Sequence, residues 1–194
     1  MSLKDKVVII TGASSGIGKA CAIAFAKQGC RVMLAAREEI KLTAALNEIK
    51  QQGGVAALCK TDVSREEDCK RLINETIKQF GRIDILINNA GISMRALLLD
   101  VDLNVIRQLM DINFWGTVYC TKYALDEILK NHGSIVGVSS IAGFKGLPGR
   151  TGYSSSKFAM QGFLEALRID QPAGKQRFAE GSPVLWRLPK FDLP

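Results

Sequence analysis

Short apolar runs alternate along the chain with longer segments of helical spacing, and this alternation restricts the possible fold more than any other feature. Five runs rich in β-branched and aliphatic residues read as buried strands, at residues 7–10, 31–36, 55–60, 83–87 and 133–139. Helical periodicity fills residues 17–28, 38–52, 64–80, 103–129 and 151–168. Near-continuous apolar strands separated by helices predict an α/β fold: a doubly wound, Rossmann-like parallel sheet covered on both faces.

Two of the expected helices carry local signals. Ser64 precedes the third helix and Glu67 follows three residues later, a spacing that predicts a capping box. Gly116 lies inside the long fourth helix and predicts a bend there.

Composition and charge exclude several classes of protein. The 194 residues are 47% hydrophobic and 23% charged, which suits one globular domain rather than a disordered or fibrous chain. The formal charge of +7 comes from scattered basic residues, so we expect a solvated surface and no nucleic-acid partner. Five cysteines without a CxxC pair, and a single histidine, predict free thiols and no metal site. No apolar run of about 18 residues and no signal-peptide pattern occur, so we expect a cytoplasmic protein without a membrane partner.

The end of the chain differs from the rest. Residues 171–194 contain four of the five prolines and keep no helical or alternating period. We therefore divide the chain into a domain at residues 1–170 and a C-terminal tail at residues 171–194, with 184–188 as its only candidate strand.

A glycine-rich turn joins the first strand to the first helix. Glycines allow a tight turn and close approach to a phosphate, and the helix N-terminus offers free N–H groups with partial positive charge. We therefore expect the turn to bind a dinucleotide through Gly12, Ser14, Ser15, Gly16, Ile17 and Gly18.

The end of the second strand bears on the choice of cofactor. Ala36 and Arg37 supply no carboxylate where NAD-preferring sites usually place one for the adenosine ribose. Arg37 can pair with a 2′-phosphate, and Lys19 could add charge, so NADP is expected rather than NAD.

Polar and small residues follow the third and fourth strands. Asp62, beside Val63, either accepts a hydrogen bond from the adenine amino group or caps the next helix at Ser64; the sequence leaves both roles open. Asn89, Ala90 and Gly91 combine turn-forming side chains with room for a flat ligand.

Later segments supply groups suited to acid–base chemistry. Tyr153 and Lys157 lie one helical turn apart and share a face, and a nearby ammonium favours the ionised phenolate. Ser139 and Ser140 follow the fifth strand, and Asn113 is a polar residue inside a helix.

Taken together, these motifs resemble the short-chain dehydrogenase/reductase family over residues 4–168. The resemblance implies a catalytic tetrad of Asn113, Ser140, Tyr153 and Lys157, with Ser140 preferred over Ser139 for its spacing to the tyrosine. In this scheme Tyr153 exchanges a proton with the substrate oxygen, and Ser140 orients that oxygen. Lys157 binds the nicotinamide ribose, with Tyr153 also touching the cofactor, and Asn113 holds a water at a kink in its helix. The expected activity is hydride transfer between NADP(H) and a small-molecule carbonyl or alcohol.

The resemblance stops at residue 171. A family member would continue with a strand, a Pro-Gly turn, a helical lid and a seventh strand, so the sheet is expected to lack its last two strands. Either a change of reading frame or a natural short variant would account for the tail. An NADP-binding protein without turnover and an inactive product remain alternative readings. The resemblance also implies a homodimer or homotetramer formed through the long helices, residues 103–129 and 151–168, and an apolar substrate pocket lined by Met94, Leu97, Leu98, Phe144 and Leu147.

Overall fold

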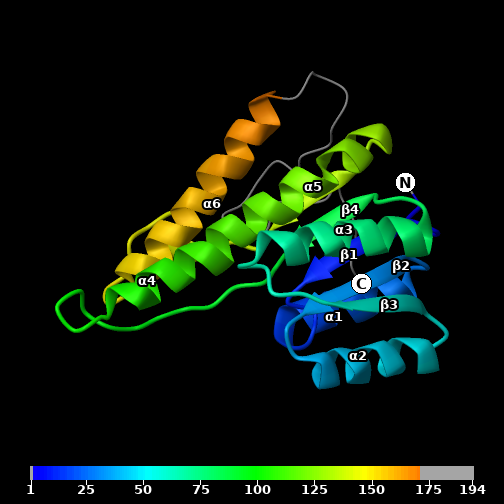
Figure 1. Ribbon diagram of the computed structural model, residues 1–194, viewed down its shortest axis with the longest axis horizontal. Coiled ribbons are helices and arrows are strands. Elements are labelled where there is room, and N and C mark those ends of the chain that lie inside the picture. Colours follow the sequence, from blue (N-terminus) through cyan, green and yellow to red (C-terminus); the bar gives the residue numbers. More distant parts are fainter. Residues whose placement is uncertain (1, 171–194) are drawn as a thin grey trace.

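A five-stranded parallel sheet lies between two layers of helices in the computed structural model, which describes residues 2–170 (Figure 1). The strand order is β3-β2-β1-β4-β5, so the chain reverses direction across the sheet between β1 and β4. The strands are β1 (Val7–Thr11), β2 (Arg31–Ala36), β3 (Val55–Lys60), β4 (Ile85–Asn88) and β5 (Ser134–Gly137).

The central strand shows why the sheet forms from apolar runs. All five residues of β1 are buried, and Ile9 pairs with Met33 of β2 on one side and Leu86 of β4 on the other. A strand with neighbours on both edges and helices on both faces is buried on both sides, so its first four residues are apolar, and the polar Thr11 stands only at its carboxyl end. The predicted α/β class and the bounds of β2 and β3 are confirmed, while β1, β4 and β5 differ from prediction by one or two residues at an end.

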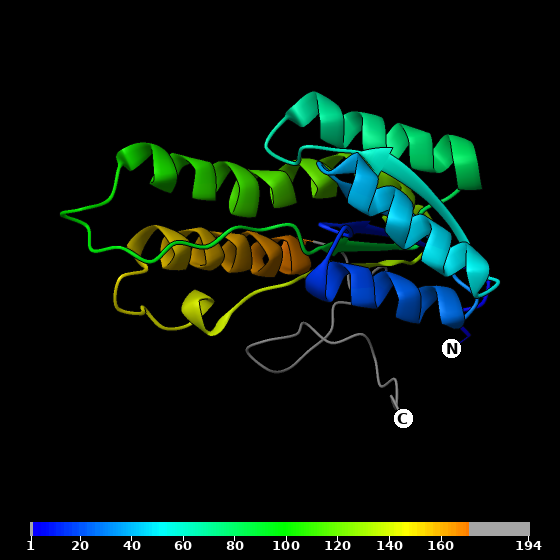
Figure 2. The same ribbon diagram turned by 90° about the horizontal axis from the view of Figure 1, so that it is seen from below.

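The helices divide between the two faces of the sheet (Figures 1 and 2). Helices α1 and α2 cover one face, and α3, α5 and α6 cover the other. The α-helices are α1 (Gly16–Lys27), α2 (Glu39–Gln51), α3 (Glu66–Phe80), α4 (Leu103–Leu109), α5 (Gly116–Lys130) and α6 (Thr151–Asp170). This arrangement confirms the doubly wound fold.

The expected long helix is interrupted by a π-helical segment. Between α4 and α5 the backbone forms η1 (Met110–Trp115), which ends directly before Gly116, where the sequence predicts a bend. A Cβ atom on Gly116 would lie 2.8 Å from Cγ2 of Val63, so glycine lets α5 approach the loop after β3 closely.

The capping box predicted for α3 is wrong. The N-cap of α3 is Arg65, without a side-chain capping bond, and the helix begins at Glu66. Ser64 instead donates from its backbone N–H (3.1 Å) and hydroxyl (2.7 Å) to Oδ1 of Asp62. This turn takes Ser64 out of the helix, which removes Glu67 from the N3 position.

All five cysteines are free thiols, as predicted. Within residues 2–170, no helix is long and apolar enough to cross a membrane, and no three His, Cys, Asp or Glu side chains are grouped to hold a metal. The sheet of this part has five strands, and the tail with its candidate strand lies outside the described residues.

Candidate functional site

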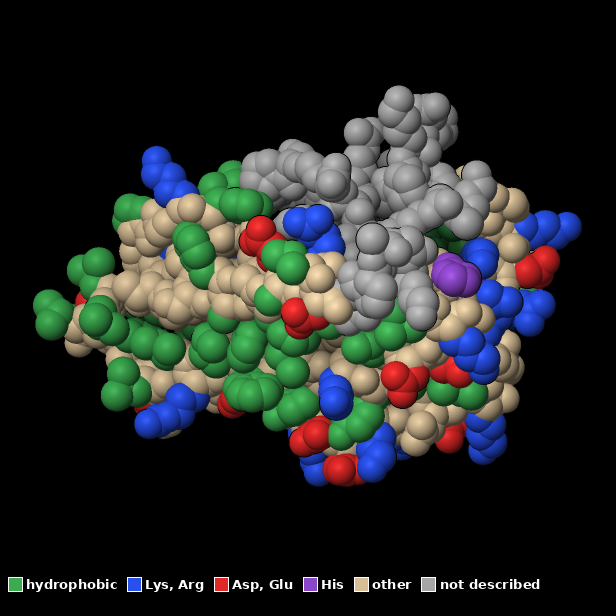
Figure 3. Space-filling view, turned by 90° about the horizontal axis from the view of Figure 1, so that it is seen from above, with side chains coloured by type: hydrophobic (Ala, Val, Ile, Leu, Met, Phe, Trp, Pro, Cys, Tyr) green, Lys and Arg blue, Asp and Glu red, His purple; other side chains and the backbone are tan. Residues whose placement is uncertain are grey.

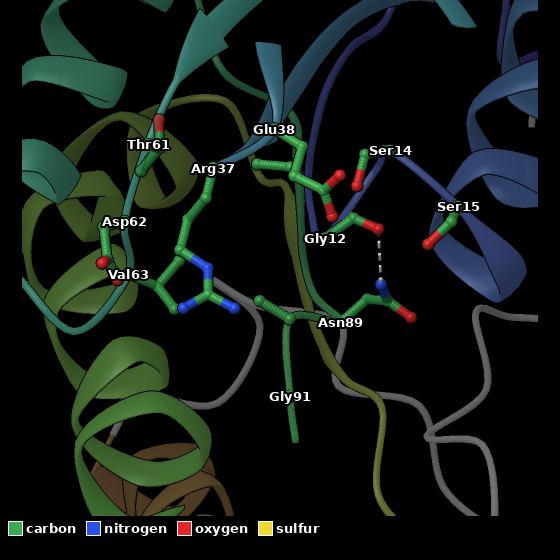
Figure 4. Close-up of a pocket in the computed structure, with 12 residues that line it drawn as sticks. Gly12, Ser14, Ser15, Arg37, Glu38, Thr61, Asp62, Val63, Asn89 and Gly91 are labelled. Carbon is green, nitrogen blue, oxygen red and sulfur yellow. Dashed lines mark hydrogen bonds between the residues drawn. The ribbon is translucent and has the colours of Figure 1, made fainter. Parts of the chain in front are cut away.

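A cavity of about 300 Å³ opens where β1 to β4 end at their carboxyl edge (Figure 4). It lies at the point where the strand order reverses, the position at which open α/β sheets bind ligands. Its lining residues come from the last residue of β2 and from the loops after four strands: Gly12, Ser14, Ser15, Ala36, Arg37, Glu38, Thr61, Asp62, Val63, Asn89, Ala90 and Gly91.

The glycine turn after β1 requires its glycines. Gly12 and Gly16 have φ values of +67° and +53°, in the left-handed region that favours glycine. A Cβ atom on Gly18 would lie 2.3 Å from the carbonyl oxygen of Gly12, so only glycine lets α1 begin this close to the turn. No acidic residue occupies the first turn of α1, which leaves its N-terminal partial charge available to an anion.

Asn89 ties the loop after β4 to this turn. Its Nδ2 donates to the carbonyl oxygens of Thr11 (2.9 Å) and Gly12 (3.4 Å), and the first of these contacts is well within hydrogen-bond range. In return, Oγ1 of Thr11 accepts hydrogen bonds from the backbone N–H groups of Asn89 and Ala90, both at 3.0 Å. These bonds fix the two loops relative to each other before any ligand binds.

Arg37 and Glu38 bring opposite charges into the same cavity. Figure 4 shows the Arg37 side chain reaching into the cavity, whereas the Glu38 carboxylate lies toward Gly12 and Ser14. Glu38 is paired with Lys41, Nζ to Oε2 at 2.8 Å, while within residues 2–170 Arg37 forms no ion pair. Lys19 does not add charge to the cavity, because its Nζ lies 2.7 Å from Oε2 of Glu48.

Of the two roles left open for Asp62, capping the helix is replaced by holding the turn that precedes it, because the N-cap of α3 is Arg65. Its Oδ1 holds the turn at Ser64, and its backbone N–H donates to Oδ2 of Asp68 at 2.9 Å. Asp62 also lines the cavity, where it is available to a ligand. The hydrogen bond from Asp62, together with the neighbouring Arg71, lowers the pKa of Asp68 even though partial burial acts in the opposite direction.

A second cluster adjoins the cavity at Gly91. Asn113 is fully buried in η1; its Oδ1 accepts from the N–H of Ile92, and its Nδ2 donates to the Ile92 carbonyl and to Oγ of Ser156, all at 2.9 Å. A Cβ atom on Gly91 would lie 3.1 Å from Oδ1 of Asn113 and 3.5 Å from Nζ of Lys157. Gly91 therefore connects the cavity to two members of the expected tetrad.

Lys157 is a buried cation at this junction. Its residue is only 5% exposed, and its Nζ donates to the carbonyl oxygen of Val138 at 2.8 Å, just beyond β5. Burial lowers the pKa of Lys157 to about 8, because removal from water disfavours the ammonium form. The lysine thus has a proton that it can release near neutral pH.

Ser140 and Tyr153 lie at the starts of two helices that pack together. Ser140 is the N-cap of the short 3-10 helix η2 (Ile141–Gly143), and its Oγ accepts from the N–H of Ala142 at 3.2 Å. Tyr153 lies in the first turn of α6, which packs against η2. Ser139 is occupied elsewhere, since its Oγ donates to Oε1 of Gln161 at 3.0 Å.

The cavity brings together most of the residues expected to bind the cofactor, but not all. Gly16, Ile17 and Gly18 form the start of α1 without lining it, and Tyr153 and Lys157 belong to the adjoining cluster. The sequence analysis missed three lining residues, Ala36, Glu38 and Thr61. Their position at the carboxyl ends of β2 and β3, or just beyond them, is the signal that could have found them, because the ends of strands in such a sheet face the ligand.

Residues 6–174 match the family described as short chain dehydrogenase, and since this is most of the sequence, the chain belongs to that family. It is 43% identical over 171 residues to 11-beta-hydroxysteroid dehydrogenase A of Arachis hypogaea, covering 87% of this chain and 49% of that protein. It is 42% identical over 170 residues to 11-beta-hydroxysteroid dehydrogenase-like 4A of Arabidopsis thaliana, covering 87% and 57%. The chain thus spans about half the length of these curated relatives.

Two solved structures share the fold. The alcohol dehydrogenase of the archaeon Thermococcus sibiricus, complexed with 5-hydroxy-NADP, superposes with a TM-score of 0.87 at 29% identity, covering 91% of this chain and 74% of that one. A short chain dehydrogenase/reductase of Burkholderia phymatum in complex with NAD gives a TM-score of 0.85 at 28% identity, covering 88% and 62%. One neighbour thus holds a derivative of NADP and the other holds NAD.

Proposed function

We propose that this chain carries the cofactor site and catalytic groups of an NADP(H)-dependent oxidoreductase acting on a carbonyl or alcohol. The observation that carries the proposal is the junction at Gly91, where the glycine-turn cavity meets the buried pair Asn113 and Lys157. A dinucleotide site and a proton-handling site are thereby contiguous.

The cavity suits a dinucleotide. Gly18 lets the start of α1 lie close against the Gly12 turn, and the first turn of this helix carries no acidic residue. Such a site accommodates the pyrophosphate, with Ser14 and Ser15 beside it. The ends of β2 and β3 supply Arg37 for the adenosine half and Asp62 for the adenine.

The nicotinamide cofactor, when bound, supplies the hydride and accepts it in the reverse reaction. Tyr153 donates a proton to the substrate oxygen, and Ser140 donates a hydrogen bond that orients this oxygen. Lys157 holds the ribose of the cofactor beside Tyr153. Asn113 fixes the loop after β4 through its two hydrogen bonds to Ile92, so its amide has a positioning role as well as the expected contact with a water.

The preference for NADP rests on the balance between Arg37 and Glu38. Arg37 can bind a 2′-phosphate in a bidentate manner, whereas Glu38 repels it and Lys41 offsets part of that repulsion. We expect thermal unfolding to shift upward by about 5 to 11 °C with NADPH at ~100 times its Kd, and by less with NADH. Arg37→Gln should abolish the difference between the cofactors, and Glu38→Gln should widen it. An equal shift with both cofactors in the wild-type chain would contradict the preference.

Turnover is tested by Tyr153→Phe. This variant should lose NADPH oxidation with carbonyl substrates by at least about 100-fold, the scale of general acid–base catalysis, and keep the NADPH thermal shift. Retained turnover would remove Tyr153 from the mechanism. A wild-type chain that binds NADPH but turns over no substrate would instead select the reading of a binding protein.

The substrate we propose is a bulky apolar ketone or alcohol. Leu97, Leu98 and Phe144 are exposed on the loops flanking Tyr153, where apolar surface could meet such a molecule, while Met94 packs into the core. Two relatives are named as hydroxysteroid dehydrogenases, which is in keeping with this class. An assay that compares an apolar cyclic ketone with a polar keto sugar tests the assignment, and a preference for the sugar would overturn it.

A further inference from the structure

Two loops meet beside Tyr153. One follows β4 and leads to α4; the other, residues 144–150, leads from η2 into α6. The backbone N–H of Ala96 in the first loop donates to the carbonyl oxygen of Gly149 in the second, at 2.9 Å. Gly149 has a φ of +66°, a conformation that favours glycine, so this contact depends on the residue present there.

Side-chain packing at the start of α6 also holds these two loops together. A Cβ atom on Gly152 would lie 3.1 Å from Sδ of Met94 and equally close to side-chain atoms of α4. Glycine at this position lets the buried Met94 lie against the start of α6. The loop of residues 93–96 is therefore held both by its backbone and by its core side chain.

Arg150 provides a third contact between the two loops, and its side chain also contacts Tyr153. Its Nη1 donates a hydrogen bond to Oγ of Ser93, and its guanidinium lies over the Tyr153 ring, 5.8 Å from the centroid. That separation is within the range of a cation–π interaction. Within residues 2–170, Arg150 pairs with no carboxylate, so these two contacts define its place.

Helix stability does not account for an arginine here. The carbonyl oxygen of Arg150 accepts from the N–H of Ser154 at 2.8 Å, which places the cation at the N-terminus of α6. A positive charge is disfavoured at this end of a helix, and no acidic residue in the first turn of α6 compensates it. A positive charge at this position lowers the stability of α6, so the arginine is better explained by the contacts of its side chain than by the stability of the helix.

We propose that Arg150 is a positioning residue for the reaction assigned to Tyr153, holding the Ser93 loop and the tyrosine ring in a fixed relation on the substrate side of the site. The proposal rests on the proposed function for its catalytic consequence. Arginine suits the role because its planar guanidinium can stack on a ring and donate hydrogen bonds at the same time. A lysine offers a point charge that meets one of these demands at a time.

Steady-state kinetics with NADPH and an apolar ketone test the proposal in Arg150→Gln, Arg150→Lys and Ser93→Ala. Arg150→Gln should lower kcat by about 10- to 100-fold, the scale of a misplaced reacting group, and leave the NADPH thermal shift unchanged. Arg150→Lys should recover part of kcat, because the charge over the ring remains. Combining Ser93→Ala with Arg150→Gln should add little to the loss, since both remove the same contact. The matched control is Arg95→Gln, an exposed arginine on the same loop, which should behave like the wild type.

Hydrogen exchange separates this proposal from the proposed function. In Arg150→Gln the amides of residues 93–96 should exchange at least about 10-fold faster than in the wild type and in Arg95→Gln. Should the wild-type chain turn over no ketone, the proposed function fails, and exchange alone then decides whether Arg150 fixes the loop. Unchanged exchange, or equal kcat values in Arg150→Gln and Arg95→Gln, would overturn the role of Arg150.

Discussion

Asp84 anchors the start of the sheet through one buried carboxylate. It is 2% exposed and accepts from Nζ of Lys6 (2.7 Å), the N–H of Val7 (3.0 Å), and Nε and Nη2 of Arg82 (2.8 and 2.7 Å). Burial opposes its ionisation, but these hydrogen bonds outweigh it and lower the pKa of Asp84. Asp84→Asn should therefore reduce the free energy of unfolding by about 3 kcal/mol, measured by urea at pH 7.

The pH dependence of this loss has a defined sign. Because the pKa of Asp84 is lower in the folded chain, its stabilisation is present above the unfolded pKa and disappears as pH falls through the folded value. Asp84→Asn and the wild type should thus converge in acid. The control is Asp5→Asn, whose exposed pair with Arg31 spans 3.5 Å and should change stability by less than about 0.5 kcal/mol. Equal losses in the two variants would contradict the assignment.

Lys157 should show the opposite pattern, because the burial of its ammonium group destabilises the fold. With its pKa lowered to about 8, the folded chain releases a proton that the unfolded chain holds up to about pH 10.5, so wild-type stability gains with pH across this window. Lys157→Met should be more stable than the wild type at pH 7 by about 2 kcal/mol, allowing for the lost bond to Val138, and should lack turnover. Urea unfolding at pH 7 and pH 10 measures the narrowing of this gap. The control Lys122→Met, at an exposed lysine, should show no such pH dependence. A stability difference between Lys157→Met and the wild type that is the same at pH 7 and pH 10 would refute the proposed effect of burying Lys157.

At the residue scale, the sequence shows which side chains could carry chemistry, but it does not show which residues contact them in the folded chain. The spacing of Tyr153 and Lys157 is visible because one helical turn relates them. The partners of Asn113 are not, because Ile92 and Ser156 lie 21 and 43 residues away and meet it only in the folded chain. The place of Glu38 in the cavity was not predicted for a related reason. The direction of its side chain depends on the conformation of the loop after β2, which residue spacing does not reveal.

At the scale of elements, the close packing of α1 against the turn after β1 should depend on the absence of a side chain at Gly18. Gly18→Ala would place Cβ 2.3 Å from the Gly12 carbonyl oxygen, a rigid backbone atom. We expect this variant to lose the thermal shift with NADPH, because the turn must move to relieve the clash. The matched control is Gly162→Ala in α6, where a Cβ atom meets nothing within 4 Å, and which should gain about 0.5–1 kcal/mol in stability. A normal NADPH shift in Gly18→Ala would contradict this account of the turn.

The elements themselves were largely predictable. Strands β2 and β3 have the predicted bounds, because β-branched and small apolar residues end abruptly at charged or polar neighbours. The π-helical segment η1 was not predicted beyond a bend, since its extra residue per turn leaves no periodic trace over six residues. The start of α3 was misplaced because the carboxylate of Asp62 competes for Ser64.

At the scale of the molecule, the distribution of surface types divides the fold in two. Figure 3 shows hydrophobic side chains gathered over the half that holds the long helices, and charged side chains over the other half. The helices around η1 and α6 expose Leu103, Trp115, Phe158 and Ile169, with Trp115 and Phe158 43% and 45% accessible. This apolar surface lies on the long helices through which the family resemblance implies a homodimer or homotetramer.

An assembly through these helices should be disrupted by a single buried charge. Trp115→Glu or Phe158→Glu would place a carboxylate in an apolar interface, where desolvation without a partner costs several kcal/mol. Size-exclusion chromatography with light scattering should then find these variants monomeric at concentrations where the wild-type chain is dimeric. Ile40→Glu provides the matched control, because Ile40 is 88% exposed on α2, away from the long helices, and its loss should leave the assembly intact. Association through this face requires the burial of its aromatic side chains. A monomeric wild type, or a dimer that persists in both helix variants, would therefore show that the apolar surface of the long helices has another role.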